Sequence, residues 1–130
     1  MKNEIFEKNA ILKQSFDFSL KVIEYCEQLE VMKRFIMANQ LFKSGTSIGA
    51  NCMEAQNAER KADFIHKMKI AAKEAEETQY WLMLYERATN YPDCKPLLDK
   101  LEEINKILAK ILSTSKRKNP ISYLLSFFIF

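Results

Sequence analysis

The chain has 130 residues, of which 48% are hydrophobic and 28% charged, and its formal net charge is +3. This length fits one domain, and so small a charge permits an acidic partner without requiring one. Two glycines and three prolines are too few for the turns of a sheet protein, so the composition predicts a few long helices.

Cysteine spacing and the apolar runs indicate the cellular setting. Cys26, Cys52 and Cys94 are odd in number and far apart, which favours neither a disulfide framework nor a metal site and predicts a reduced, cytoplasmic protein. The charged start, MKNEIFEKNA, is unlike a signal peptide. No apolar run reaches the ~20 residues of a membrane span, so we do not expect a membrane protein.

The first helix is predicted at about 3–28, with Asn3 as its N-cap. Apolar residues recur in it mostly every three or four positions, which is the period of a helix with one buried face. The residues predicted to face the core are Ile5, Leu12, Phe16, Leu20, Ile23 and Cys26.

The second helix is predicted at about 33–57 and the third at about 62–89. Both carry a row of apolar or small residues in which steps of three and four alternate, the heptad pattern of helices packed side by side. The row of the second helix is Ala38, Leu41, Gly45, Ile48, Cys52 and Ala55, and that of the third is Phe64, Met68, Ala71, Ala75, Thr78, Leu82 and Tyr85.

The fourth helix is predicted at about 95–115, after the break at NYPDCKP. Its apolar row is Leu97, Leu101, Ile104, Leu108 and Ile111. Four amphipathic helices with short connections predict an all-α fold, an antiparallel up-down-up-down four-helix bundle over residues 1–118. An apolar C-terminal tail follows at 119–130.

The stretch KSGTSIGANCMEA holds Gly45 and Gly49, the only two glycines of the chain. The heptad row continues through this stretch and the spacing differs from that of a Walker A loop, so we expect helix and not a phosphate-binding loop. In a hairpin of the second and third helices, both glycines would face small residues, which lets two backbones approach closely. These small residues are Ala71, Ala72 and Ala75.

A polar stripe runs beside the heptad row of the second helix. It consists of Gln40, Ser44, Ser47, Asn51 and Glu54. Hydrogen bonding to neighbouring helices is one interpretation, and contact with a protein or a nucleic acid is the other.

Catalytic patterns are few. His66 is the only histidine, and the motif Asp63-x-x-His66 occurs once, whereas a di-metal bundle needs two Glu-x-x-His pairs. Glu74 and Glu77 lie near one face of the third helix, where ion pairing with lysine is the commoner use of such acids. We therefore expect no enzyme, no cofactor, no metal and no small-molecule substrate.

Basic residues concentrate in two parts of the chain. Residues 31–53 contain three basic residues and no acid, and residues 93–130 contain seven basic residues against four acidic ones. Such stretches can contact phosphate backbones, although a solvated face is the simpler interpretation. The candidate nucleic-acid contacts are Lys33, Arg34, Lys43, Lys110, Lys116, Arg117 and Lys118.

Apolar residues outside the heptad rows suggest self-association. Phe35 and Phe42 form a flanking row on the second helix, and Tyr80 and Trp81 crowd the third. The tail segment ISYLLSFFIF, residues 121–130, is too short to span a membrane, and we expect it to dock on the bundle or on a neighbouring subunit.

Residues 40–82, QLFKSGTSIGANCMEAQNAERKADFIHKMKIAAKEAEETQYWL, resemble the signature of the four-helix-bundle proteins of bacterial 23S ribosomal RNA intervening sequences. The accessory variability protein of diversity-generating retroelements belongs to the same superfamily. The resemblance implies an antiparallel bundle that assembles as a homo-oligomeric ring, often a pentamer, without known enzymatic activity. The motif positions are Ser47, Asn51, Glu54, Asp63, Glu74 and Trp81, which carry no assigned role.

These observations and the resemblance together predict a cytoplasmic, non-catalytic, homo-oligomeric bundle. Its expected partner is RNA, DNA or a ribonucleoprotein, bound through basic surfaces, as the retroelement relative associates with reverse transcriptase and nucleic acid. The alternative is a purely structural or protein-interaction ring that binds no nucleic acid. An enzyme is the third possibility, and it would need a polar pocket with perturbed acids near Glu54 or Glu74.

Overall fold

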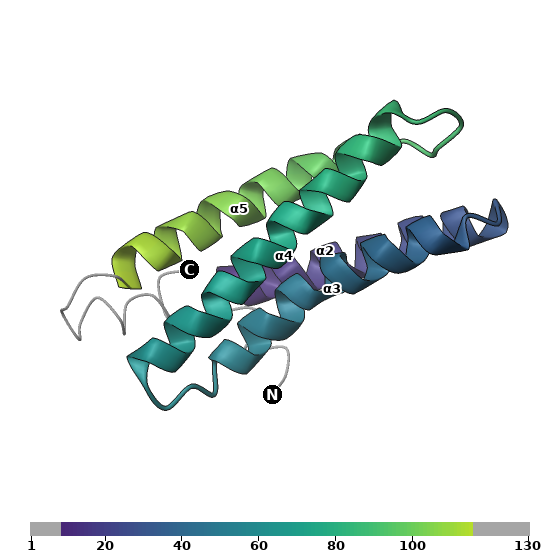
Figure 1. Ribbon diagram of the computed structural model, residues 1–130. Helices are drawn as coiled ribbons and strands as arrows, with labels where there is room; N and C mark the ends of the chain where they lie inside the picture. The colour runs from purple at the N-terminus through teal and green to yellow at the C-terminus, as the bar shows by residue number, and fades with distance from the viewer. Residues whose placement is uncertain (1–8, 116–130) are drawn as a thin grey trace.

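A computed structural model describes residues 9–115. These residues form four helices and no strand: α2 (Ala10–Val31), α3 (Phe35–Ala55), α4 (Lys61–Arg87) and α5 (Lys95–Ser115) (Figure 1). The predicted cap Asn3, the basic residues 116–118 and the apolar tail at 119–130 lie outside the described range. The all-α prediction is confirmed for the range that is described.

The first helix begins later than predicted, because Asn9 caps it. The Asn9 backbone is extended, with φ −127° and ψ 105°, and its side-chain oxygen accepts a hydrogen bond from the Leu12 amide. An asparagine in this position satisfies one of the unpaired amides of the first turn. The helix continues to Val31, and a turn of three residues, with Lys33 at φ 63°, leads into α3.

The helices enclose one hydrophobic core. α3 packs against α2 and α4, and α5 packs against α4 and α2. Every residue of the heptad rows predicted for α3, α4 and α5 is buried, which confirms those three rows. Burial of these side chains is the main stabilising contribution to such a fold.

The row predicted for α2 is largely wrong. Phe16, Leu20 and Ile23 were expected in the core, yet they are 45%, 48% and 38% exposed. The buried face of α2 is turned from the predicted one by about a residue, and Ser15 lies on it. Its buried residues are Ile11, Leu12, Ser15, Phe18, Val22, Tyr25, Cys26 and Leu29.

The two glycines make close contacts with α2, and not in the first place with the alanines of α4. A β-carbon on Gly45 would lie 2.9 Å from a methyl group of Val22. One on Gly49 would lie 3.3 Å from the carbonyl oxygen of Ser15. Glycine therefore allows α3 to approach α2 closely. On α4, Ala71 and Ala75 are buried in the core and Ala72 is partly buried against it.

Candidate functional site

Three members of the polar stripe of α3 use their hydrogen-bond donors within that helix. The hydroxyl groups of Ser44 and Ser47 donate to the carbonyl oxygens of Gln40 and Lys43, at 3.2 and 2.5 Å. The Asn51 amide donates to the Ser47 carbonyl oxygen at 2.8 Å. Bonds to the carbonyl one turn earlier hold these side chains against the helix. Ser44, Ser47 and Asn51 thus bond within α3, whereas Glu54, at the end of the stripe, reaches a neighbouring helix through Lys67 of α4.

Two family-motif acids, Glu54 and Asp63, lie where α3 passes into α4. Lys67 of α4 forms a salt bridge with Glu54 at 2.7 Å, and Arg60 holds Asp63 at 3.0 Å. The Arg60 guanidinium keeps the pKa of Asp63 below its ordinary value. Both acids line an open hollow of about 400 Å³ together with His66. The lowered pKa favours the ionised form of Asp63, which suits a structural ion pair better than proton transfer.

Glu74 lies on α4, away from that hollow. Partial burial and the neighbouring Glu77 carboxylate raise the pKa of Glu74, while Lys73 and Lys43 oppose the shift. The Trp81 indole nitrogen donates to Glu77 at 3.2 Å. The motif residues therefore do not form one site: Ser47 and Asn51 lie within α3, Glu54 and Asp63 near the α3–α4 turn, and Glu74 and Trp81 along α4.

The basic candidates within the described residues do not converge on one surface. Lys33 and Arg34 lie at the α2–α3 turn, whereas the end of α5 that carries Lys110 lies at the opposite end of the molecule (Figure 1). Lys43 lies midway along α3. Residues 9–115 contain 15 basic and 15 acidic side chains, so the whole charge excess of the chain falls in Lys116, Arg117 and Lys118.

Arg34 is engaged within the protein, in a cluster that the sequence did not predict. Its guanidinium lies 4.1 Å from the centre of the Tyr91 ring, and it donates to the Thr89 carbonyl oxygen at 3.4 Å. Tyr91 stacks on Tyr85, and Tyr85 on Tyr25, with ring centres 5.2 and 6.5 Å apart. This cluster joins the α2–α3 turn to the α4–α5 connection.

The buried phenols of that cluster are hydrogen-bonded. Tyr25 donates to the Pro92 carbonyl oxygen at 2.7 Å, and Tyr85 donates to that of Met37 at 2.6 Å. Burial raises the pKa of both tyrosines well above the ordinary value. The phenols therefore remain neutral donors throughout the physiological pH range, which suits a structural role.

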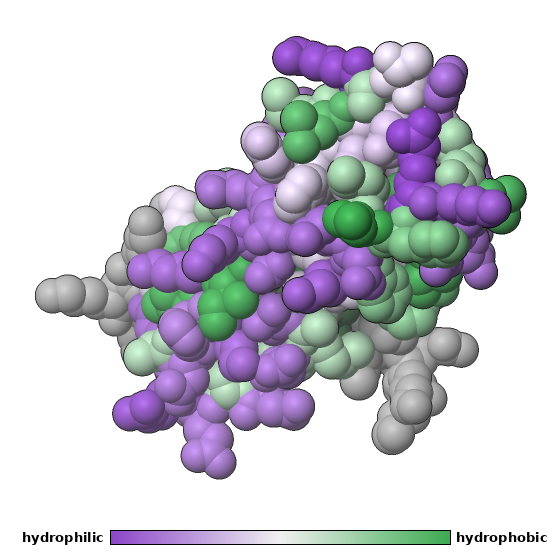
Figure 2. Space-filling view, turned by 45° about the vertical axis from the view of Figure 1, so that its right-hand side comes forward, coloured by the Kyte–Doolittle hydropathy of each residue, from purple (hydrophilic) through white to green (hydrophobic). Residues whose placement is uncertain are grey.

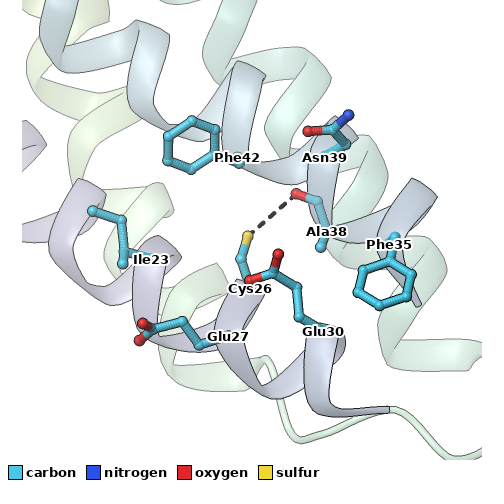
Figure 3. A pocket seen from close by; sticks show the side chains of 8 residues that line it. All are labelled: Ile23, Cys26, Glu27, Glu30, Phe35, Ala38, Asn39 and Phe42. Carbon is cyan, nitrogen blue, oxygen red and sulfur yellow. Dashed lines mark hydrogen bonds between the residues drawn. The ribbon is translucent and has the colours of Figure 1, made fainter. Parts of the chain in front are cut away.

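A hollow of about 410 Å³ lies between the end of α2 and the start of α3. Figure 3 shows Ile23 and Phe42 on facing helices at one end, Phe35 at the other, and Glu27 and Glu30 along the α2 side. The Cys26 thiol donates to the Ala38 carbonyl oxygen at 3.3 Å. Burial raises the pKa of Cys26 to about 11, so this thiol is protonated and a poor nucleophile at neutral pH.

Apolar side chains also reach the surface away from the core. Figure 2 shows one face, on which they appear in separate areas between hydrophilic side chains. At the α2–α3 turn, Val31, Phe35 and Ile36 are 85%, 57% and 73% exposed. No group of three or more metal-ligating side chains occurs within residues 9–115. Over the same range, no helix is long and apolar enough to cross a membrane.

Within residues 9–115, the fold is that of an all-α protein with four helices around one core. The chain belongs to the family of 23S rRNA-intervening sequence proteins, whose model matches residues 7–110, and this confirms the resemblance predicted from residues 40–82. It is similar to a crystal structure of a protein of unknown function from the S23 ribosomal protein family of Bacteroides thetaiotaomicron. The two are 38% identical over 80% of this chain and 99% of that one, with a TM-score of 0.76. A search among curated proteins gives no match.

Proposed function

We propose that this protein is a non-catalytic, self-associating, antiparallel four-helix bundle that binds nucleic acid or a ribonucleoprotein through residues 116–118. The observation that carries the proposal is the charge distribution. Residues 9–115 are balanced, and the excess of +3 lies in three consecutive basic residues directly after α5. When the rest of the protein has no net charge, a run of basic residues is the part that attracts phosphate groups most strongly. The name of the family, which refers to 23S rRNA, makes RNA the first partner to test.

Contacts between helices support the antiparallel order. On α3 and α4, Glu54 meets Lys67 and Met37 meets Tyr85, so residue numbers rise along one helix as they fall along the other. On α2 and α3, Cys26 meets Ala38, and Ser15 lies beside Gly49. The three-residue turn at 32–34 fits a helical hairpin.

Exposed apolar residues at the α2–α3 turn support self-association. Val31, Phe35 and Ile36 are adjacent there, and Met83 and Leu84 near the end of α4 are also exposed. Such residues in one region are characteristic of contacts between proteins. Repeated use of one such contact closes a ring when the rotation between subunits permits it.

Self-association would also strengthen the binding of nucleic acid. Three basic residues can neutralise at most three phosphates, which for a single strand gives a slope of about −2 in log K against log salt concentration. Binding by one chain is therefore weak. A ring presents several such runs, and simultaneous contacts raise the overall affinity.

The alternative, a structural or protein-interaction ring without nucleic acid, is favoured by the neutrality of residues 9–115 and by the position of Arg34. In that ring, residues 116–118 would serve solubility. The two functions differ in their salt dependence and in their dependence on these three residues.

The test is binding of a fluorescent single-stranded RNA across a salt series. The triple variant Lys116→Gln, Arg117→Gln, Lys118→Gln is compared with a control that loses the same charge from exposed sites, Lys21→Gln, Lys69→Gln, Lys73→Gln. We expect binding that weakens with salt, is lost in the first variant and persists in the second. Equal loss in both, or no binding at ~50 mM salt, overturns the proposal.

A further inference from the structure

A third hollow, which we call the α2–α3 groove, runs along α2 and α3. It encloses about 360 Å³ and is lined on α2 from Leu12 to Ile23 and on α3 from Phe42 to Met53. Phe16, Phe42 and Met53 line it, and they are 45%, 44% and 39% exposed. The groove is thus an apolar surface that the four described helices leave open to water.

The polar groups of the α2–α3 groove are already satisfied. Ser15, Ser19 and Thr46 donate to the carbonyl oxygens of Ile11, Ser15 and Phe42 of their own helices, at 2.6, 3.0 and 2.7 Å. Among the described residues, none that lines the groove is charged. An occupant would therefore be held by apolar contact, and a charged occupant would lose hydration without gaining a partner.

The chain itself contains a segment with the matching composition. Residues 121–130, ISYLLSFFIF, have eight apolar or aromatic residues, two serines and no charge. Such a segment gains free energy by leaving water, at roughly 25 cal/mol per Å² of apolar surface buried.

The position of the end of α5 and the length of the segment also suit the groove. α5 ends at the end of the molecule where α2 begins and α3 ends, which is the end of the groove marked by Leu12 and Met53 (Figure 1). The five residues 116–120 can span about 17 Å when extended. From Leu12 to Ile23 the α2 wall measures about 16 Å, and ten residues span about 15 Å as a helix and up to about 33 Å when extended.

We infer that residues 121–130 occupy the α2–α3 groove of their own chain. In that position they cover Phe16, Phe42 and Met53, and residues 116–118 form a short basic loop between α5 and the groove. The inference does not depend on nucleic-acid binding, because it concerns only contacts within the chain.

The test is disulfide cross-linking in the full chain. Ala50 is exposed and lines the groove, and the three native cysteines are buried. We expect the pair Ala50→Cys and Ser126→Cys to form an intrachain disulfide under mild oxidation, with a yield that does not change on dilution, because the linked segment has a high effective concentration. The control pair Lys69→Cys and Ser126→Cys, on the exposed face of α4, should link far less. Equal yields in both pairs, or links only between chains, overturn the inference; the latter result would place the segment of a second copy in the groove.

A dye that fluoresces on apolar surfaces gives a second test. A docked segment and an undocked segment predict changes of opposite sign in dye fluorescence when the segment is removed. If the segment fills the groove, a variant ending at residue 118 exposes the groove and its dye fluorescence rises several-fold. If the segment is undocked, the same removal takes away apolar surface and fluorescence falls. Unchanged fluorescence, with the mass of the wild-type assembly, indicates that another subunit covers the groove and also contradicts the inference. Circular dichroism checks that the truncated variant is still helical. If the variant has lost its helical structure, the cross-linking experiment on the full chain decides the question.

Discussion

A β-carbon placed on Gly45 would lie 2.9 Å from Cγ2 of Val22, a side chain with no exposed surface. Two opposing effects follow for Gly45→Ala. Alanine gains about 1 kcal/mol of helix propensity over glycine. Overpacking against a rigid buried valine costs about 1–3 kcal/mol. We expect a net loss of about 1 kcal/mol in the free energy of unfolding, measured by urea denaturation.

Two companion variants separate packing from propensity. Gly49→Ala would meet Ser15 at 3.3 Å, a milder contact, so we expect a smaller loss than at Gly45. When Val22→Ala is combined with Gly45→Ala, the added methyl group finds room, and the combined loss should be less than the sum of the two single losses. A Gly45→Ala protein more stable than wild type would contradict the close α2–α3 contact.

The buried thiols predict a fall in stability at alkaline pH. Cys52 is fully buried, and burial raises its pKa to about 12 from about 9. The folded state thus favours the protonated thiol. This contribution is complete below pH 9 and is lost as the pH rises from about 9 towards 12, with a slope of up to about 1.4 kcal/mol per pH unit for one group.

The measurement is the free energy of unfolding between pH 8 and pH 10.5. Wild type should lose stability over this range, and Cys52→Ala should lose less for each pH unit. Some slope will remain, because burial also raises the pKa of Cys26 and Cys94. Parallel curves for the two proteins would show that Cys52 does not titrate in this way.

Neighbouring residues Arg34 and Lys33 carry the same charge and have different surroundings. The Arg34 guanidinium lies on the Tyr91 ring and donates to the Thr89 carbonyl oxygen, so Arg34→Gln should cost about 1 kcal/mol of stability. Lys33→Gln should change it by less than about 0.5 kcal/mol, as is usual for an exposed side chain. Thermal unfolding of both variants checks this difference, and equal losses would argue against the Arg34–Tyr91 contact.

Much of the fold was predictable because the heptad rows of α3, α4 and α5 each have one plausible core face. α2 differs, since it carries two apolar rows. The sequence favoured the row with Phe16, Leu20 and Ile23, but the buried face includes the polar residue Ser15. Ser15 fits there because Gly49 of α3, which has no side chain, lies beside it. Such pairing between helices leaves no periodic signal in either helix alone.

The candidate sites were less predictable because they depend on distant contacts. Sequence proximity placed Lys33 and Arg34 among the nucleic-acid contacts, but Arg34 meets Tyr91, which is 57 positions away. The motif pattern found Glu54 and Asp63, yet their ion pairs with Lys67 and Arg60 are visible only in three dimensions. No local pattern could have revealed the stacked tyrosines.

The most direct test of the proposed self-associating nucleic-acid-binding bundle is its mass in solution, measured by light scattering at low salt with and without single-stranded RNA. We expect a discrete multiple of 15.3 kDa without RNA and a larger mass with it, and the increase should disappear as salt is added. A mass of 15.3 kDa that RNA leaves unchanged would contradict both self-association and RNA binding.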